Sequence, residues 1–306
     1  MSSRAENGVR AGIDLGGTGV RIVVADQGAE LASRTLPTAL FSSIAQEDRT
    51  LELANAVRQM VPDGRTLLSL GIGASGPVDS TRGVIENTDT LPAFSHFPLV
   101  SEMSRLLEVP VVIDNDAVVA AIGEFHLGAG AGSRRMLMVT LGTGVGVSLL
   151  IDGQPFRAAN GTHPEGGHIP VFGNAIRCYC GLQGCWESLA SRSWLQQELL
   201  KVLPDVAYAS HDLPFFQEQC QRNPPLQALF HRYGRYVGRG LGTLIMLYGP
   251  DVTVLSGSAA RLYPLYRQGV EESLDRSAGF AVNRNIVQSS LGDAAGAIGA
   301  ALLAAA

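Results

Sequence analysis

Short apolar and β-branched runs alternate with glycine- and aspartate-containing turns at the start of the chain. Two such runs cover residues 9–14 and 20–25, and Gly16-Gly17-Thr18-Gly19 lies between them. A turn at residues 26–28 precedes a weaker third run at 30–36. This pattern predicts three consecutive strands joined by tight turns.

The pattern then changes to a helical period over residues 45–61 and returns to a buried strand at 67–73. Another apolar strand is expected at 110–114, and an alanine-rich helix is expected from Asp116 to about residue 127. Strands and helices that alternate in this way indicate an α/β protein.

The pattern of strands and turns at the beginning of the chain recurs later in the sequence. Residues 137–154, LMVTLGTGVGVSLLIDGQ, align with residues 10–28 so that both glycine turns are in register. An internal duplication predicts two similar lobes that form a cleft bordered by both turns. Further along, we expect a helix at 230–248, a strand at 252–255, a closing helix at 292–306, and a loop or short helices at 204–225.

Composition narrows the classes of protein. The chain has 306 residues, of which 46% are hydrophobic and 17% charged, which is typical of a globular protein of about two domains. A net charge of −5 without a basic block argues against nucleic-acid binding. A polar start and the lack of a long apolar run argue against secretion and a membrane span, so we expect a cytoplasmic protein.

The two glycine turns are candidate phosphate sites, because backbone N–H groups of glycine turns can approach a phosphate without hindrance from a Cβ. Asp14 before the first turn adds a carboxylate for a magnesium-bound water, and Thr18 adds a hydroxyl. An ordinary hairpin turn is the alternative for each, but two related turns favour phosphate binding. The turns match neither a P-loop nor a dinucleotide fingerprint.

The segment Ile113-Asp114-Asn115-Asp116 ends a predicted strand and begins a helix. Ligands of α/β proteins bind at the carboxyl ends of strands, so a carboxylate at this position can reach a substrate. Alternatively, Asp116 is a helix cap, a role for which aspartate is favoured.

Three of the four cysteines lie within eight residues, at Cys178, Cys180 and Cys185, and His168 precedes them. Thiols remain reduced in the cytoplasm, so this spacing favours a metal site over disulfides or inert cysteines. One nitrogen and three sulfur ligands complete a closed tetrahedral zinc site, which predicts a structural ion. The fourth cysteine, Cys220, is expected to be a plain thiol.

Two carboxylates flank the proposed zinc ligands. Glu165 comes three residues before His168, and Glu187 comes two residues after Cys185. Rigidly held carboxylates suit a polyhydroxylated ligand, because each can accept two hydroxyl hydrogen bonds. Solvated surface charges are the alternative for both.

The pattern His-x9-Cys-x-Cys-Gly-x2-Gly-Cys-x-Glu at residues 168–187 resembles the signature of the ROK family of repressors and sugar kinases. The resemblance extends to residues 14–18, 115–117, 123–124, 141–146 and 165–168. It implies the actin/hexokinase-like (ribonuclease H-like) fold with duplicated βββαβα units. The implied lobes are a small one of residues 9–117 plus 292–306 and a large one of residues 118–291 that carries the zinc loop.

The resemblance also implies roles for single residues. Asp116 matches the catalytic base of the family. The implied sugar contacts are Gly76, Asn115, Glu165, His168, Glu187 and one of Asn87 and Asp89. His168 would use one ring nitrogen for zinc and the other for the sugar. The implied nucleotide contacts are Asp14, Gly16, Gly17, Thr18, Gly142, Thr143, Gly144 and Gly257.

The implied activity is transfer of phosphate from ATP with Mg²⁺ to the 6-hydroxyl of glucose, allose, N-acetylmannosamine or N-acetylglucosamine, by a homodimer that contains structural Zn²⁺. The alternative is a sugar-sensing transcriptional regulator of the same family. Such regulators carry an additional N-terminal DNA-binding domain. The first strand begins near residue 9, so we expect no room for that domain and favour the kinase.

Overall fold

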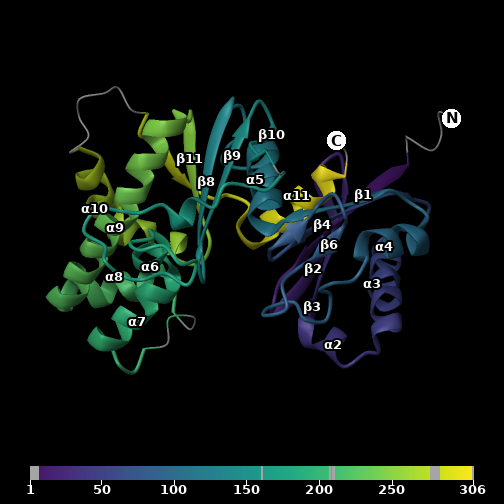
Figure 1. Ribbon diagram of the computed structural model, residues 1–306, viewed down its shortest axis with the longest axis horizontal. Coiled ribbons are helices and arrows are strands. Elements are labelled where there is room, and N and C mark those ends of the chain that lie inside the picture. Colours follow the sequence, from purple (N-terminus) through teal and green to yellow (C-terminus); the bar gives the residue numbers. More distant parts are fainter. Residues whose placement is uncertain (1–6, 160, 207, 209–210, 276–282, 305–306) are drawn as a thin grey trace. The chain divides into compact units, whose positions relative to one another are not determined.

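The computed structural model describes residues 7–159, 161–206, 208, 211–275 and 283–304. The chain forms two compact units (Figure 1). Unit 1 comprises residues 1–131, 157–162 and 293–306, and unit 2 comprises residues 132–156 and 163–292. Each unit contains one five-stranded sheet.

The sheet of unit 1 has the strand order β3-β2-β1-β4-β7. The three predicted N-terminal strands pair in antiparallel fashion, while β1, β4 and β7 run parallel. The strands are β1 (Gly8–Leu15), β2 (Gly19–Asp26), β3 (Ala29–Pro37), β4 (Thr66–Ala74) and β7 (Val111–Asn115). A short hairpin of β5 (Val78–Asp79) and β6 (Val84–Ile85) follows β4.

Helices cover both faces of this sheet. Alternate residues of β1 point to opposite faces, so Ile13 joins the core beside Leu53 of α3 while Gly12 faces the C-terminal helix α11. A Cβ on Gly12 would lie 1.9 Å from the carbonyl oxygen of Ala297, so only glycine permits this close packing. The helices are α2 (Thr38–Ser42), α3 (Gln46–Met60), α4 (Leu99–Leu107), α5 (Asp116–Leu127) and α11 (Ala295–Leu303).

The sheet of unit 2 repeats this topology. Its order is β10-β9-β8-β11-β12, with antiparallel pairing from β10 to β8 and parallel pairing from β8 to β12. The strands are β8 (Arg135–Leu141), β9 (Val145–Ile151), β10 (Gln154–Pro155), β11 (Val252–Ser256) and β12 (Ile286–Gln288). The predicted duplication and the α/β fold class are therefore confirmed.

The long helix α9 (Pro224–Tyr248) organises the rest of unit 2, and Trp186, Tyr233 and Tyr266 are fully buried in the core around it. It packs against α6 (Glu187–Ala190), α7 (Arg192–Val202), α8 (Leu213–Arg222) and α10 (Tyr263–Asp275). Short 3-10 turns are η1 (Gly166–His168), η3 (Ala260–Leu262) and η4 (Gly292–Ala294). Among the described residues, no helix has both the length and the apolar character needed to cross a membrane.

The proline-rich stretch 204–225 differs in detail from the sequence prediction. It contains the ten-residue helix α8 and the first two residues of α9, which begins at Pro224 and not near residue 230. Proline occupies the first turn of each helix, where its missing N–H costs nothing, and Asp212 and Asn223 cap the two helices. The prolines therefore start these helices.

Candidate functional site

The carboxyl ends of three parallel strands lie side by side in unit 1. Leu15 of β1 pairs with Ala74 of β4, and Ala74 pairs with Asn115 of β7. The residues that follow these strand ends are thereby brought together. They include the predicted site residues Gly16, Gly76 and Asp116.

Asp116 is the first residue of α5, and both of its carboxylate oxygens accept hydrogen bonds. Oδ2 accepts from the Ser75 hydroxyl at 3.0 Å, and Oδ1 accepts from the backbone N–H of Ala117 at 2.8 Å. The helix is capped by Asn115, whose Oδ1 also accepts from Ala117 at 2.9 Å. Asp116 is therefore not the N-cap, and its carboxylate is oriented by a side chain from another strand end.

Asp14 is a partly buried carboxyl near Asp116. Burial first, and then repulsion by Asp116, raise the pKa of Asp14 to about 7, while the charge of Arg21 opposes this and that of Asp293 adds to it. Three neighbouring carboxylates opposed by one arginine suit a hydrated divalent cation, which would offset their repulsion. The donor set at Asp14 is thus compatible with the predicted Mg²⁺.

The first glycine turn is a tight hairpin between β1 and β2. The backbone N–H of Gly16 donates to the carbonyl of Gly19 at 3.0 Å, and the Thr38 hydroxyl donates to the carbonyl of Gly16 at 2.6 Å. Gly17 and Thr18 are exposed at the tip. These hydrogen bonds fix the base of the turn, whereas its tip is accessible, as a phosphate site requires.

The predicted sugar loop places Asn87 and Asp89 in different environments. Asn87 is buried, and its amide donates to the carbonyl of Gly76 at 2.7 Å and to the Thr90 hydroxyl at 2.5 Å. Its Oδ1 accepts from the backbone N–H of Thr90 at 3.0 Å. Asp89 is exposed. Gly76 contacts Asn115, because a Cβ on Gly76 would lie 2.8 Å from the Asn115 amide nitrogen.

Arg157 is a contact of this region that the sequence did not reveal. Its guanidinium forms an ion pair with Asp114, the residue before Asn115. The side chain of Asp114 is only 6% exposed. Asp114 also accepts a hydrogen bond from the backbone N–H of Asn115 at 2.8 Å. No motif connects residues 43 positions apart, so only the fold could bring them together.

In unit 2 the second glycine turn joins β8 to β9 and is clasped by the start of α7. The backbone N–H of Arg192 donates to the carbonyl of Gly142 at 2.8 Å, and its guanidinium donates to the Thr143 hydroxyl at 3.0 Å. The Ser193 hydroxyl donates to the carbonyl of Thr143 at 2.8 Å. Like the first turn, the Gly142 turn is fixed by hydrogen bonds from outside the turn. It also contains an internal hydrogen bond from the backbone N–H of Gly142 to the carbonyl of Gly144.

A cavity of about 840 Å³ opens beside this turn. Its lining combines the predicted Gly142 and Thr143 with polar residues that no motif indicated, among them Arg192, Tyr208, Ser258 and Arg261. Gly257 precedes Ser258 with a φ of 83°, and a Cβ there would lie 2.7 Å from the carbonyl oxygen of Leu141. The size and the arginines of the cavity suit a phosphorylated ligand.

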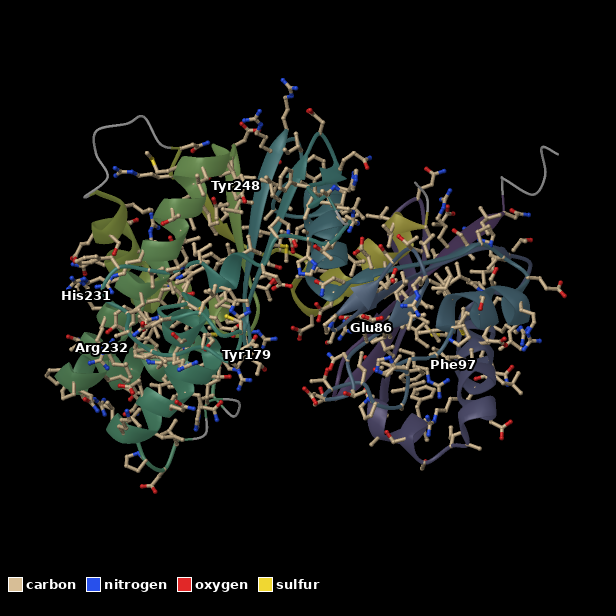
Figure 2. All side chains as sticks on the ribbon, viewed as in Figure 1. Glu86, Phe97, Tyr179, His231, Arg232 and Tyr248 are labelled. Carbon is tan, nitrogen blue, oxygen red and sulfur yellow. The ribbon has the colours of Figure 1, made fainter. Side chains whose placement is uncertain are left out.

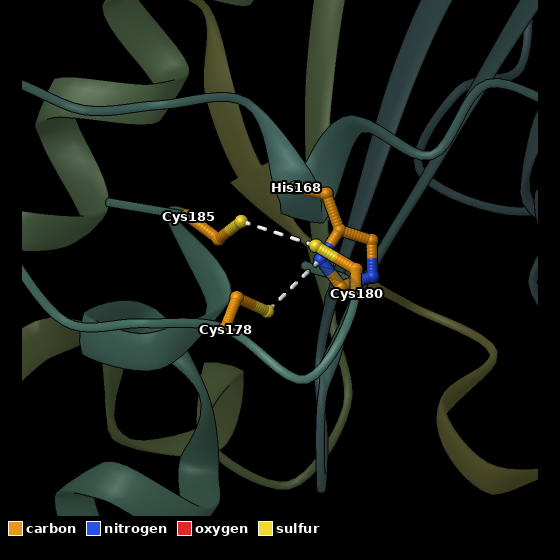
Figure 3. Close-up of side chains that lie close together, drawn as sticks. All are labelled: His168, Cys178, Cys180 and Cys185. Carbon is orange, nitrogen blue, oxygen red and sulfur yellow. Dashed lines mark hydrogen bonds between the residues drawn. The ribbon is translucent and has the colours of Figure 1, made fainter. Parts of the chain in front are cut away.

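The predicted zinc ligands converge in unit 2 (Figure 3). Candidate ligand atoms of His168, Cys178, Cys180 and Cys185 all lie within 4.8 Å of one another. Cys178 Sγ is 3.5 Å from His168 Nδ1, and the sulfurs of Cys180 and Cys185 are also 3.5 Å apart. These separations resemble those between ligands of a tetrahedral zinc, and the donor set fits that ion.

The three predicted sugar ligands of unit 2 gather around the exposed Tyr179, which is labelled in Figure 2. Its hydroxyl lies 3.3 Å from Nε2 of His168, interacts with Glu187, and is near the charge of Glu165. His168 thus turns Nδ1 toward the thiol of Cys178 and Nε2 toward the hydroxyl of Tyr179. Glu187 also accepts a hydrogen bond from the backbone N–H of Val145 at 2.9 Å.

Comparisons with known proteins agree with these features. The model of the ROK family matches residues 10–306. The structure of a ROK hexokinase from Thermus thermophilus is similar with a TM-score of 0.83 and 30% identity, over 97% of this chain and 98% of that one. A ROK family glucokinase from Streptomyces griseus, in complex with glucose and AMPPNP, has a TM-score of 0.74 and 29% identity, over 97% and 99% of the chains.

A curated regulator is also similar. The xylose repressor of Bacillus subtilis is 25% identical over 79% of this chain and 62% of the repressor. A glucokinase of Streptomyces coelicolor is 28% identical over 97% of this chain and 98% of the enzyme. Kinases and regulators therefore both occur among the relatives.

Proposed function

The chain belongs to the ROK family, and we propose that it is an ATP-dependent kinase for the 6-hydroxyl of a hexose or N-acylhexosamine. The observation that carries this proposal is the carboxylate of Asp116, directly after β7, where Ser75 and Ala117 each donate a hydrogen bond to one oxygen. A general base needs such a fixed orientation toward the proton it removes. Similarity to glucokinases along nearly the whole chain supports the same reaction.

In the proposed reaction, Asp116 accepts the proton of the sugar hydroxyl. The hydroxyl oxygen then forms a bond to the γ-phosphorus as the bond between this phosphorus and the β–γ bridging oxygen breaks, which gives sugar phosphate and ADP. Asp14 would hold a hydrated Mg²⁺, which would supply positive charge to offset that of the phosphates. The exposed backbone of Gly17 and Thr18 in unit 1 and the Gly142 turn in unit 2 are each proposed as phosphate contacts.

The cavity beside the Gly142 turn is proposed to hold the nucleoside part of ATP. Ser258 and Tyr208 line it, and the Tyr208 hydroxyl donates to the carbonyl of Ser258 at 2.9 Å, which fixes the loop after Gly257. Arg192 and Arg261 would interact with the phosphate chain, because guanidinium groups pair well with phosphate.

The proposed sugar contacts are Gly76, Asn115, Glu165, His168, Glu187 and Asp89. Asp89 is preferred to Asn87 because both ends of the Asn87 amide are already used, by Thr90 of its own loop and by the carbonyl of Gly76. Carboxylates, amides and imidazoles are side chains that exchange hydrogen bonds with hydroxyl groups, as sugar recognition requires. Glucose, allose, N-acetylmannosamine and N-acetylglucosamine are the candidate sugars.

Zinc is proposed to have a structural role. His168, Cys178, Cys180 and Cys185 would fill all four positions of a tetrahedral ion and leave none for a substrate. Burial, together with the neighbouring thiols of Cys180 and Cys178, raises the pKa of Cys185 to about 12, so zinc binding would release its proton. The ion would fix the orientation of the His168 ring and thereby the position of its Nε2.

We propose that the protein acts in the cytoplasm as a homodimer and does not bind nucleic acid. The competing function is that of a sugar-responsive transcriptional regulator, since a xylose repressor is among the relatives. The two functions differ in turnover and in DNA binding.

ADP release measured over a panel of hexoses and N-acylhexosamines tests the kinase. We expect ATP- and Mg²⁺-dependent turnover with at least one sugar, and a loss in kcat of about 10²- to 10⁴-fold in Asp116→Asn, with sugar binding largely retained. Turnover of the variant within a few-fold of the wild type would reject Asp116 as the base. Sugar binding without ADP release, together with a sequence-specific DNA gel shift that sugar reverses, would favour the regulator.

A further inference from the structure

We propose that Ser75 is a positioning residue that holds the base Asp116 in its reactive orientation and ties it to the loop of residues 87–90. This inference rests on the proposed kinase function. Ser75 lies outside both glycine turns and outside the zinc-loop motif, and none of these motifs gives it a role.

Ser75 determines the direction in which Asp116 can accept a proton. Its hydroxyl donates to Oδ2 at 3.0 Å, while the N–H of Ala117 holds Oδ1 at 2.8 Å. The Ala117 contact comes from the next residue and fixes only one edge of the carboxylate. The Ser75 contact comes from a different strand end, 41 residues away, so it sets the rotation of the carboxylate relative to the sheet.

The main chain of Ser75 is itself anchored on both sides. Its N–H donates to the carbonyl of Leu15 at the end of β1 at 3.2 Å, and its carbonyl accepts from the amide of Asn87 at 3.2 Å. Such an anchored hydroxyl keeps a neighbouring carboxylate in place without reorganisation.

Asn87 extends this connection to the first glycine turn. Besides Ser75, its amide bonds the Thr90 hydroxyl and the carbonyl of Gly76. Thr90 lies against Gly17, where a Cβ would be 3.3 Å from its carbonyl oxygen. Ser75, Asn87 and Thr90 therefore form one chain of contacts from Asp116 to the tip of the Gly16–Gly17 turn.

Phosphoryl transfer is sensitive to this arrangement because a displaced base loses its alignment with the hydroxyl proton. A hydroxyl that only orients the base should affect kcat more than sugar affinity. Threonine at position 75 retains the hydroxyl, whereas alanine removes it, so the pair separates the hydrogen bond from the backbone contacts.

The test compares Ser75→Ala and Ser75→Thr in the full chain, with ADP release and sugar binding by calorimetry as readouts. We expect Ser75→Ala to lower kcat about tenfold with the sugar Kd within twofold of wild type, and Ser75→Thr to recover most of that loss. In an Asp116→Asn background, Ser75→Ala should cause no further loss. A kcat within twofold of wild type for Ser75→Ala, or an equal loss in the Asp116→Asn background, would overturn the role of Ser75.

The same variants distinguish a failure of the proposed kinase function from a failure of the Ser75 role. If Asp116→Asn itself keeps wild-type turnover, the base is misassigned, whatever Ser75→Ala does. If Asp116→Asn is inactive and Ser75→Ala is unaffected, only the positioning role is wrong.

Discussion

The carboxylate of Glu187 accepts a hydrogen bond from the backbone N–H of Val145 at 2.9 Å and lies against Gly144, where a Cβ would come within 2.3 Å of Oε2. The residue that ends the zinc-loop motif therefore supports the second glycine turn. The sequence motif predicted a sugar contact alone for Glu187. In the structure the same carboxylate lies next to a proposed phosphate contact and next to Tyr179.

Glu187→Ala should therefore raise the KM for ATP as well as the KM for the sugar, each about tenfold, because a charge-assisted hydrogen bond to the turn is lost. Glu165→Ala is the matched control, since its side chain is 71% exposed and Oε1 lies 3.7 Å from Nε2 of His163, away from the Gly142 turn's own hydrogen bonds. That variant should raise only the sugar KM. Steady-state kinetics with each substrate varied would contradict this role if Glu187→Ala left the ATP KM unchanged.

Asp89 and Asn87 should behave differently although they are two residues apart. Asp89→Asn removes an exposed charge and should raise the sugar KM several-fold with an unchanged melting temperature. Asn87→Ala removes an amide with three acceptors and should lower stability by about 1–3 kcal/mol. Thermal melts and sugar kinetics of both variants distinguish the roles. A stable Asn87→Ala variant with a raised sugar KM would reverse the assignment.

Zinc should affect the sugar more than ATP. Cys180 is the exposed member of the cluster, so Cys180→Ser should give a folded protein with less than stoichiometric zinc and a raised sugar KM. ATP affinity should change little, because Glu187 follows Trp186, which is fully buried and bonded to the carbonyl of Tyr236 at 2.9 Å independently of the metal.

Cys220→Ser, outside the cluster, is the control and should keep full zinc content. Metal analysis of protein purified without chelator, circular dichroism and kinetics provide the measurements. The absence of zinc from the wild-type protein would contradict the proposed site. A zinc-free Cys180→Ser variant with normal sugar kinetics would show that the metal contributes to stability alone.

Asp14 should make the folded state less stable as the pH rises. Its pKa is about 7 in the folded chain against an ordinary value of 3.8, so between these values the folded state holds a proton that the unfolded state has lost. This contribution to stability is complete below about pH 4 and is lost as the pH rises through 7. Its full size is at most about 4 kcal/mol.

Asp14→Asn should accordingly be more stable than wild type at pH 8, with a difference that fades toward pH 4. Thermal melts across this range, without added nucleotide or magnesium, measure it. Asp63→Asn, at an exposed turn, should follow the wild-type curve. A constant offset between Asp14→Asn and wild type at every pH would show that the effect is not titration of Asp14.

The sequence predicted most strands and the duplication because β-rich runs and glycine turns leave strong local patterns. It also predicted the convergence of His168 with three cysteines, since a histidine and closely spaced cysteines are typical of a zinc site. It did not reveal Ser75, Arg157 or Arg192. Each acts through a partner more than 40 positions away, and a single serine or arginine carries no local pattern.

The start of α9 could not be placed for a different reason. Prolines at 224 and 225 have the same local appearance in a loop and in the first turn of a helix. What decides between them is burial of Leu226 and Leu229 in the core of unit 2, which is a tertiary effect.

Two glycines of α9 give a matched pair of substitutions for the packing around the zinc loop. A Cβ on Gly240 would lie 2.1 Å from the ring of Trp186, whereas a Cβ on Gly242 would meet the Leu274 side chain at an ordinary 3.5 Å. Gly240→Ala must displace a buried ring and should cost about 1–3 kcal/mol of stability. Gly242→Ala replaces glycine in a helix interior and should stabilise the protein by about 0.5–1 kcal/mol.

Denaturant melts of both variants measure this difference, and kinetics extend it to the site. Because Trp186 lies between Cys185 and Glu187, its displacement by Gly240→Ala should also raise the KM for sugar and for ATP, as expected for Glu187→Ala. Gly242→Ala should leave both KM values unchanged. Equal stability of the two variants would show that Trp186 can move without cost, and the link from α9 to the zinc loop and the Gly142 turn would then be refuted.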